Sequence, residues 1–304
     1  MINRRQFIRN TTAAVGGLVL YNSSVAGTKT KLKLSFSTLG CPKWPLTDVL
    51  SFATKHGYDG IELRGIMGEV DLTKCPDLST PERIAATKKM VADKNLKIVN
   101  LGASAALHHS DPEKRKSSLD DAKKFIDMAQ KLDCPYIRVF PNNLPKDQDR
   151  KATLDLIAAG LTELGQYAKG TNVTVLLETH GDVVASEDIL YVMKNSEGPA
   201  VGLIWDVVNM WSITKESPAI VYEKLKKYIR HTHIKDAKFT GTELHYVLVG
   251  QGETPIGDAV KLLANGNYKG FYSFEWEKLW HPEIEEPEIA IAAYPKQMQE
   301  YVKA

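Results

Sequence analysis

Four side chains of types that bind metals each stand at the C-terminal end of an apolar run in this sequence. They are Glu178 in VTVLLETH, Asp206 in AVGLIWD, His233 in YIRHTHIKD and Glu275 in GFYSFEWE. Three carboxylates and one imidazole make an oxygen-rich set that suits Mn²⁺, Mg²⁺, Co²⁺ or Zn²⁺, although zinc more often gathers several histidines or cysteines. The pattern therefore predicts a site for one divalent metal and metal-assisted chemistry on a polar, oxygen-rich small molecule.

Short β-rich runs alternate with longer helical patterns from Lys31 onward, and the four metal-binding positions end four of these runs. We expect strands at residues 32–37, 60–63, 97–101, 136–140, 173–178, 201–206, 229–234 and 271–275. We expect helices at residues 47–56, 81–94, 111–132, 147–169, 186–194, 218–227, 256–265 and 287–301. Thr80-Pro81 and Asp111-Pro112 are helix-start signatures, and Ser186 is the expected N-cap of the fifth helix.

Strands that alternate with helices favour parallel pairing, because each return crossover needs a helix. Eight such units in roughly 270 residues match an α/β protein with a single closed (β/α)8 TIM barrel. The alternative is an open doubly wound sheet, but the turn after the first strand, STLGCP, has no glycine-rich phosphate fingerprint. No composition break splits residues 30–304, so we expect one barrel domain whose strand ends bring the four ligands to one mouth.

Composition and charge exclude several classes of protein. The 304 residues are 43% apolar and 25% charged, as in a globular protein with a full core. The net charge of +2, without a basic cluster, makes no electrostatic case for a nucleic-acid partner. Three cysteines at irregular spacing, Cys41, Cys75 and Cys134, are no disulfide framework, although a bridge between the first two stays open.

The first residues differ in character from the rest of the chain. Arg4-Arg5 precedes a short apolar stretch and then Ser24-Val25-Ala26, a pattern typical of a twin-arginine export signal with its cleavage site. The apolar stretch is shorter than the ~20 residues of a membrane span, so we expect no stable membrane anchor. The hypothesis is a signal at residues 1–26 and a periplasmic protein; the alternative is an ordinary basic N-terminus.

Six segments in order resemble the xylose isomerase-like sugar isomerases and epimerases, a superfamily that includes endonuclease IV. They are GYDGIEL at 57–63, LLETH at 176–180, GLIWD at 202–206, HTHIKD at 231–236, GQGE at 250–253 and SFEW at 273–276. The resemblance covers nearly the whole chain after the signal. It implies that Glu178, Asp206, His233 and Glu275 bind the metal. It also implies that Glu178 and Glu275 act as catalytic acid and base, as in the ketose 3-epimerases.

The implied chemistry begins with removal of a proton next to a carbonyl, which a metal assists by stabilising the enolate oxygen. Two carboxylates on opposite faces of the sugar can then remove and return the proton, which epimerises the carbon. The leading hypothesis is a divalent-metal-dependent sugar isomerase or epimerase that forms an enediolate on a sugar or keto-sugar. The alternatives are a lyase or dehydratase acting on 3-keto glycosides or keto-polyols, and a noncatalytic sugar-binding protein. Near-neutral charge opposes the endonuclease chemistry of the superfamily.

Further residues near the strand ends are candidates for binding a small carbohydrate substrate: Glu62, His108, His180, Asn209 and Lys235. Glu62 ends the second strand, His108 follows the third, and His180 lies two residues past Glu178. The resemblance makes Lys235 a pocket residue and also implies a possible homo-oligomer.

Two departures from the family pattern weaken an assignment to the free-ketose epimerases. Asn209 stands where the family often has a substrate-binding histidine, and Val184 stands where some epimerases carry a second acidic residue. Neither departure touches the predicted metal ligands.

Overall fold

The computed structural model describes residues 31–196 and 198–303, so the predicted export signal lies outside the described residues. Among the described residues, no helix is long and apolar enough to cross a bilayer. Cys41, Cys75 and Cys134 are buried free thiols, and the bridge between the first two that the sequence left open is not formed.

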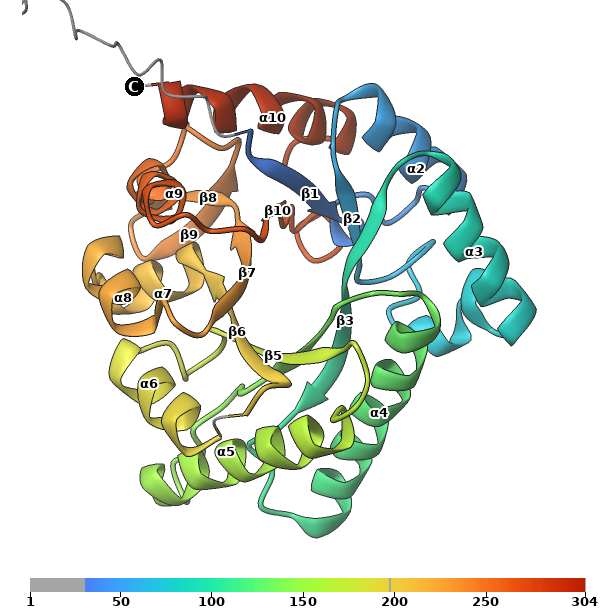
Figure 1. Ribbon diagram of the computed structural model, residues 1–304. Helices are drawn as coiled ribbons and strands as arrows, with labels where there is room; N and C mark the ends of the chain where they lie inside the picture. Colours follow the sequence, from blue (N-terminus) through green and yellow to red (C-terminus); the bar gives the residue numbers. More distant parts are fainter. Residues whose placement is uncertain (1–30, 197, 304) are drawn as a thin grey trace, which may run out of the picture. The chain divides into compact units, whose positions relative to one another are not determined.

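Eight parallel strands close into one barrel in the order β1-β10-β7-β6-β5-β4-β3-β2, which confirms the predicted TIM barrel (Figure 1). Their bounds are β1 (Lys33–Ser37), β2 (Gly60–Leu63), β3 (Lys97–Ala106), β4 (Tyr136–Phe140), β5 (Thr174–Glu178), β6 (Val201–Asp206), β7 (Ile229–Ile234) and β10 (Phe271–Phe274). Each strand was predicted to within a residue or two except β3, whose C-terminal end extends to Ala106.

Helices surround the strands, as Figure 1 shows. Their bounds are α2 (Leu46–Lys55), α3 (Pro81–Asp93), α4 (Pro112–Lys131), α5 (Arg150–Tyr167), α6 (Ser186–Asn195), α7 (Val207–Thr214), α8 (Pro218–Leu225), α9 (Ile256–Asn265) and α10 (Pro287–Lys303), with short 3-10 helices at Thr38–Gly40, Leu72–Lys74 and Pro76–Leu78. The predicted helix starts at α3 and α4 are confirmed. Thr80 accepts a hydrogen bond from the Arg83 amide, and Asp111 accepts one from the Lys114 amide.

The prediction that Ser186 caps the fifth helix is wrong. Ala185 holds the N-cap position of α6 without a side-chain bond, and Ser186 is the first helical residue. Glu216 provides the acceptor from outside the helix, because its Oε2 accepts from the Ser186 amide at 2.9 Å and its other oxygen accepts from the Ser186 hydroxyl. The Glu216 carboxylate, from a distant loop, therefore accepts from a helix-start amide in place of a local N-cap side chain.

Two elements near the mouth were not predicted. The first is α7, which begins directly after β6 because Oδ1 of Asp206 accepts from the Asn209 amide at 2.8 Å. The second is an antiparallel hairpin of β8 (Asp236–Thr240) and β9 (Glu243–Val247), whose turn includes Gly241 at a φ of 65°. Both elements follow strands that carry metal-binding positions, so they add walls to the candidate site.

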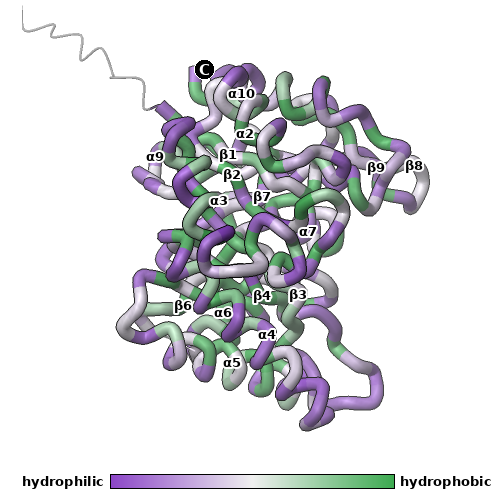
Figure 2. Tube along the Cα trace, turned by 90° about the vertical axis from the view of Figure 1, so that its right-hand side faces the viewer, coloured by the Kyte–Doolittle hydropathy of each residue, from purple (hydrophilic) through white to green (hydrophobic). Residues whose placement is uncertain are grey.

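The strands are largely buried, and most of their apolar side chains belong to one hydrophobic cluster together with residues from the surrounding helices. Figure 2 shows hydrophobic segments along the strands and more hydrophilic segments at the outer turns. Polar contacts instead cross the barrel interior, because Glu62 on β2 meets two histidines on β7 although these strands are not neighbours. A TIM barrel interior is usually filled by branched apolar side chains, so this polar layer is a special feature of the chain.

Candidate metal centre

The four predicted ligands converge at the C-terminal ends of four barrel strands. Glu178 ends β5, Asp206 ends β6, His233 lies one residue before the end of β7, and Glu275 follows β10 directly. One ligand atom from each residue lies within 4.8 Å of the other three, and all four side chains are buried. Neighbouring strands hold them in register, since Asp206 pairs with His233 and His233 pairs with Ser273. The geometry therefore confirms that these four positions meet.

The donor set fits a divalent cation. Nδ1 of His233 lies 2.9 Å from Oε1 of Glu178 and 3.1 Å from Oε1 of Glu275. Oδ2 of Asp206 lies 2.7 Å from the Lys235 ammonium but accepts no hydrogen bond among the described residues. Three buried carboxylates repel one another unless cations offset them, and burying an uncompensated charge is costly. The set that the structure assembles is the oxygen-rich one that hard divalent ions prefer.

The pKa values show how strongly these charges interact. Burial disfavours a charged His233 ring, but Glu275, Glu62 and Glu178 outweigh it and raise the pKa of His233 well above its ordinary value. Burial also opposes ionisation of Glu178, yet His233 and Arg138 lower the pKa of that carboxyl to about 2. Burial dominates at Asp206, where it raises the pKa to about 7 against the opposing effect of Lys235. The site therefore keeps Glu178 ionised, with the His233 ring between Glu178 and Glu275.

Lys235, which the resemblance makes a pocket residue, lies against two of the predicted metal ligands. Its Nζ is 2.7 Å from Oδ2 of Asp206, from Oε2 of Glu275 and from Oε1 of Glu277. The side chain is buried, and the three carboxylates raise the pKa of its ammonium well above the ordinary value despite the burial that opposes charge. Lys235 is therefore a charged hydrogen-bond donor within 2.7 Å of two predicted metal ligands.

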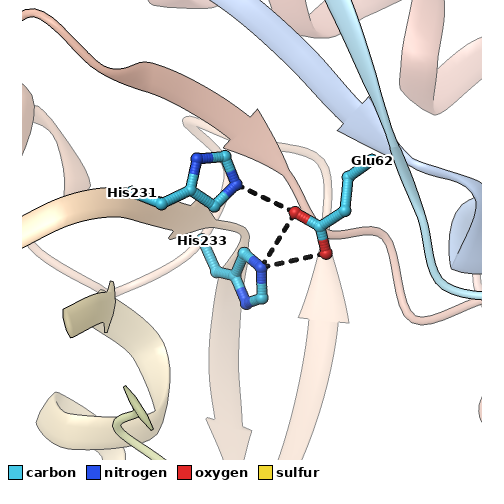
Figure 3. Close-up of side chains that lie close together, drawn as sticks. All are labelled: Glu62, His231 and His233. Carbon is cyan, nitrogen blue, oxygen red and sulfur yellow. Dashed lines mark hydrogen bonds and ion pairs between the residues drawn. The ribbon is translucent and has the colours of Figure 1, made fainter. Parts of the chain in front are cut away.

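Glu62, predicted to bind substrate, contacts two histidines of β7, and its role toward a substrate stays a prediction. The side chain lies in the barrel interior, where the rings of His231 and His233 both face it (Figure 3). Oε2 of Glu62 accepts from Nε2 of His231 at 2.9 Å, and both oxygens lie 3.2 Å from Nε2 of His233. Glu62 is fully buried, so its polar atoms serve these protein contacts.

The family model of the xylose isomerase-like TIM barrel matches residues 50–296 of the chain. The chain belongs to this family. A fructoselysine 3-epimerase from Shigella flexneri is 24% identical over 254 residues, which are 80% of this chain and 90% of that protein. An inosose dehydratase from Clostridium tetani is 25% identical over 139 residues, which are 40% of this chain and 46% of that protein.

A solved structure shares the fold of this chain. A crystal structure of an IOLI protein with a bound zinc atom matches with a TM-score of 0.74 at 20% identity, over 90% of this chain and 98% of that one. The named relatives are enzymes of the xylose isomerase-like family, and they include both an epimerase and a dehydratase.

Two charged residues that the predictions missed complete this xylose isomerase-like site. Arg138 on β4 is buried, donates from Nη1 to Oε2 of Glu178 at 2.5 Å, and stacks its guanidinium 3.8 Å from the Phe140 ring centre. The signal was an arginine inside the apolar strand YIRVF. Glu277 accepts a hydrogen bond from the Lys235 ammonium. The sequence pattern that could have revealed it is Glu-Trp-Glu, which puts Glu275 and Glu277 on one face of an extended chain.

The remaining predicted substrate-binding residues have protein contacts of their own. His180 places Nδ1 3.0 Å from Oδ1 of Asn142 and packs its ring 4.3 Å from that of Phe140. The side-chain amide of Asn209 donates from Nδ2 to the Thr179 carbonyl at 3.2 Å. His108 packs 4.1 Å from the His109 ring and lies outside the four-ligand set. Their roles toward a substrate stay predictions.

Proposed function

We propose that this protein is a divalent-metal-dependent enzyme that isomerises or epimerises a sugar or keto-sugar through an enediolate. The observation that carries the proposal is the convergence of Glu178, Asp206, His233 and Glu275. Mn²⁺, Mg²⁺, Co²⁺ and Zn²⁺ all suit this donor set. The match to a fructoselysine 3-epimerase along most of both chains supports a carbohydrate substrate.

The bound ion would supply a Lewis acid at the substrate carbonyl. Glu178 and Glu275 are then the residues that remove and return the proton. They come from β5 and from the end of β10, which β6 and β7 separate in the barrel, so the two carboxylates approach a substrate from different strands. Arg138 holds Glu178 in place at 2.5 Å and favours its ionised form, as a proton acceptor requires. Lys235 places a charged donor beside a substrate oxygen that becomes negative during the reaction.

A dehydratase acting on a keto-polyol or 3-keto glycoside is the second candidate, because Lys235 puts a cationic donor at the centre of the site. Its Nζ lies 2.7 Å from two of the predicted metal ligands, a position from which it can donate a hydrogen bond to a departing hydroxyl. The inosose dehydratase relative shares the family with the epimerase, and Asn209 stands where the resemblance leads us to expect a histidine. Both candidates share the first proton abstraction.

The test is to incubate the metal-loaded protein in deuterated water with a panel of ketoses and 3-keto glycosides and to follow the products by proton NMR. Deuterium in an epimerised or isomerised sugar supports the first candidate and identifies the carbon. Loss of water or of the aglycone supports the second. A sugar that binds without exchange or turnover contradicts both and favours a noncatalytic binding protein.

We further propose that residues 1–26 direct export to the periplasm by the twin-arginine route. The paired Arg4-Arg5 and the small residues Ser24-Val25-Ala26 support this proposal. The twin-arginine route carries folded proteins, which suits an enzyme whose metal is loaded before export.

A further inference from the structure

Glu62 and His231 lie beneath the candidate metal centre and have no role in the proposed proton transfers. Both side chains are fully buried, and together with His233 they form a second group whose ligand atoms lie within 4.8 Å of one another. Two roles suit this composition: a second metal site that shares His233, or a hydrogen-bonded support for the first. The geometry of the three side chains distinguishes them.

The contacts within the group are those of hydrogen bonds. Nε2 of His231 lies 2.9 Å from Oε2 of Glu62, and Nε2 of His233 lies 3.2 Å from both oxygens (Figure 3). The Ser273 hydroxyl donates a third bond to Oε2 at 3.3 Å, which helps satisfy the buried carboxylate.

The two ring nitrogens of His233 face different partners. Nδ1 faces Glu178 and Glu275 in the predicted metal site, whereas Nε2 faces Glu62 in the barrel interior. A carboxylate accepts hydrogen bonds, so Glu62 favours a proton on Nε2, and an ion bound by Glu178 and Glu275 would take Nδ1 as its imidazole ligand. An ion bound to Nε2 would make His233 bridge two metals and would take away the hydrogen that Glu62 accepts.

His231 orients the carboxylate in the same way from the next inward position on β7. Its Nδ1 is buried and has no partner among the described residues, so its proton belongs on Nε2, where it is donated to Glu62. Strand irregularities occur at both ends of the group, between Ile61 and Glu62 on β2 and opposite His231 at Leu203/Ile204 on β6. Such irregularities re-aim side chains near active sites.

We propose that Glu62, itself held by His231, is a positioning residue that fixes the tautomer and ring orientation of His233 so that Nδ1 binds a single metal ion. The inference rests on the proposed metal site. Metal-ligating histidines commonly donate their other N–H to a carboxylate, and loss of that partner typically costs about 10- to 100-fold in metal affinity. The polar layer of the barrel thereby acquires a function in metal binding.

The experiment titrates metal-free protein with Mn²⁺ by calorimetry and records imidazole ¹⁵N NMR spectra of the Zn²⁺-loaded form. We expect one equivalent of metal and a His233 ring protonated at Nε2. Glu62→Gln should weaken Mn²⁺ binding by about 10- to 100-fold. His231→Gln should stay close to wild type because its amide nitrogen replaces the Nε2 donor, and His231→Leu should weaken binding. Ser35→Ala is the matched control, because this buried hydroxyl on β1 has no partner among the described residues.

Each other result separates the possibilities. Two equivalents of metal, falling to one in Glu62→Gln and His231→Gln, would overturn the proposal in favour of a second metal site. Unchanged affinity and an unchanged His233 ¹⁵N spectrum in a destabilised Glu62→Gln variant would reduce the group to a structural role. Absence of divalent metal binding in the wild type would instead remove the proposed function itself.

Discussion

The candidate reaction depends on a few buried charges whose positions are set by direct contacts between side chains. Glu178 accepts from Arg138, Glu275 accepts from Lys235, and both carboxylates lie beside Nδ1 of His233. His233 and Arg138 lower the pKa of Glu178, whose burial would otherwise raise it, so that this carboxylate is ionised near neutral pH. At the scale of single residues, catalysis is therefore expected to be sensitive to the charge of one carboxylate.

Replacement of Glu178 by glutamine keeps the shape of the side chain but removes its ability to accept a proton. We expect turnover to fall by about 10²- to 10⁴-fold, the usual contribution of a general base, with the fold retained. Product NMR measures turnover, and circular dichroism checks the fold. Glu163→Gln is the matched control, because Glu163 only pairs with Lys123 at the surface of α5. Turnover equal to wild type in Glu178→Gln would remove this residue from the mechanism.

Replacement of Lys235 distinguishes the two candidate reactions. In Lys235→Met the side chain keeps nearly the same length but loses the ammonium that lies 2.7 Å from Oε2 of Glu275. We expect dehydration to fall by about 10²- to 10³-fold, because the charge of a departing hydroxyl loses its cationic hydrogen-bond donor. Exchange of the substrate proton with solvent, which reports the first step alone, should fall less. Equal losses in exchange and in product formation would contradict a role specific to the leaving group.

At the scale of elements, the segment after the hairpin is fastened to the metal-binding side of the barrel. Asp236, at the start of β8, accepts from the backbone amides of Ala237, Gly250 and Gly252 at 2.9 Å each. Glycine is needed at position 252 because a Cβ there would lie 2.1 Å from Oδ1 of Asp236. Since Asp236 directly follows Lys235, this anchor also restrains the lysine at the site.

The variant Gly252→Ala tests the anchor. The added methyl must displace Asp236 or the loop, which typically costs about 1–3 kcal/mol of unfolding free energy. Denaturant unfolding measures this cost, and we expect turnover to fall as well because Lys235 is displaced. Gly198→Ala is the control, since no atom lies within 4 Å of its added Cβ. Equal stability of the two variants would show that the loop absorbs the methyl without moving the anchor.

At the scale of the whole molecule, the barrel places ligands from β5, β6 and β7 and from the residue after β10 around one point, so a bound metal would join four strands. Any ion that binds the folded chain but not the unfolded chain stabilises the fold. At a free concentration one hundred times its Kd the gain is about 2.7 kcal/mol. The fold and the site are therefore coupled.

Removal of the metal with a chelator should lower the melting temperature. For a chain of this length, about 2.7 kcal/mol corresponds to roughly 5 °C. Differential scanning calorimetry with and without Mn²⁺ measures the shift, and Glu275→Gln, which lacks one ligand charge, should show a smaller one. Identical melting temperatures with and without metal would contradict a specific site in the folded chain.

The export proposal concerns the chain as a whole as well. Replacing Arg4 and Arg5 with lysine should trap the protein in the cytoplasm, which fractionation and immunoblotting would detect. A second variant, Lys31→Arg, changes a basic residue outside the proposed signal and should leave export normal. Normal export of the lysine pair variant would contradict a twin-arginine signal.

The sequence by itself determined the eight barrel strands and the four strand-end positions that converge, because periodicity and strand ends are local properties that parallel barrel geometry converts into neighbours. Only the tertiary structure decided the contacts of Glu62, Arg138 and Glu277. Glu62 reaches β7 across the barrel interior, and no spacing along the chain encodes which inward side chains meet there. The sequence pattern did not predict the helix α7 either, because Asp206 both ends a strand and caps the helix that follows. Closure of the barrel therefore decides which strand-end and inward side chains come into contact and form the site.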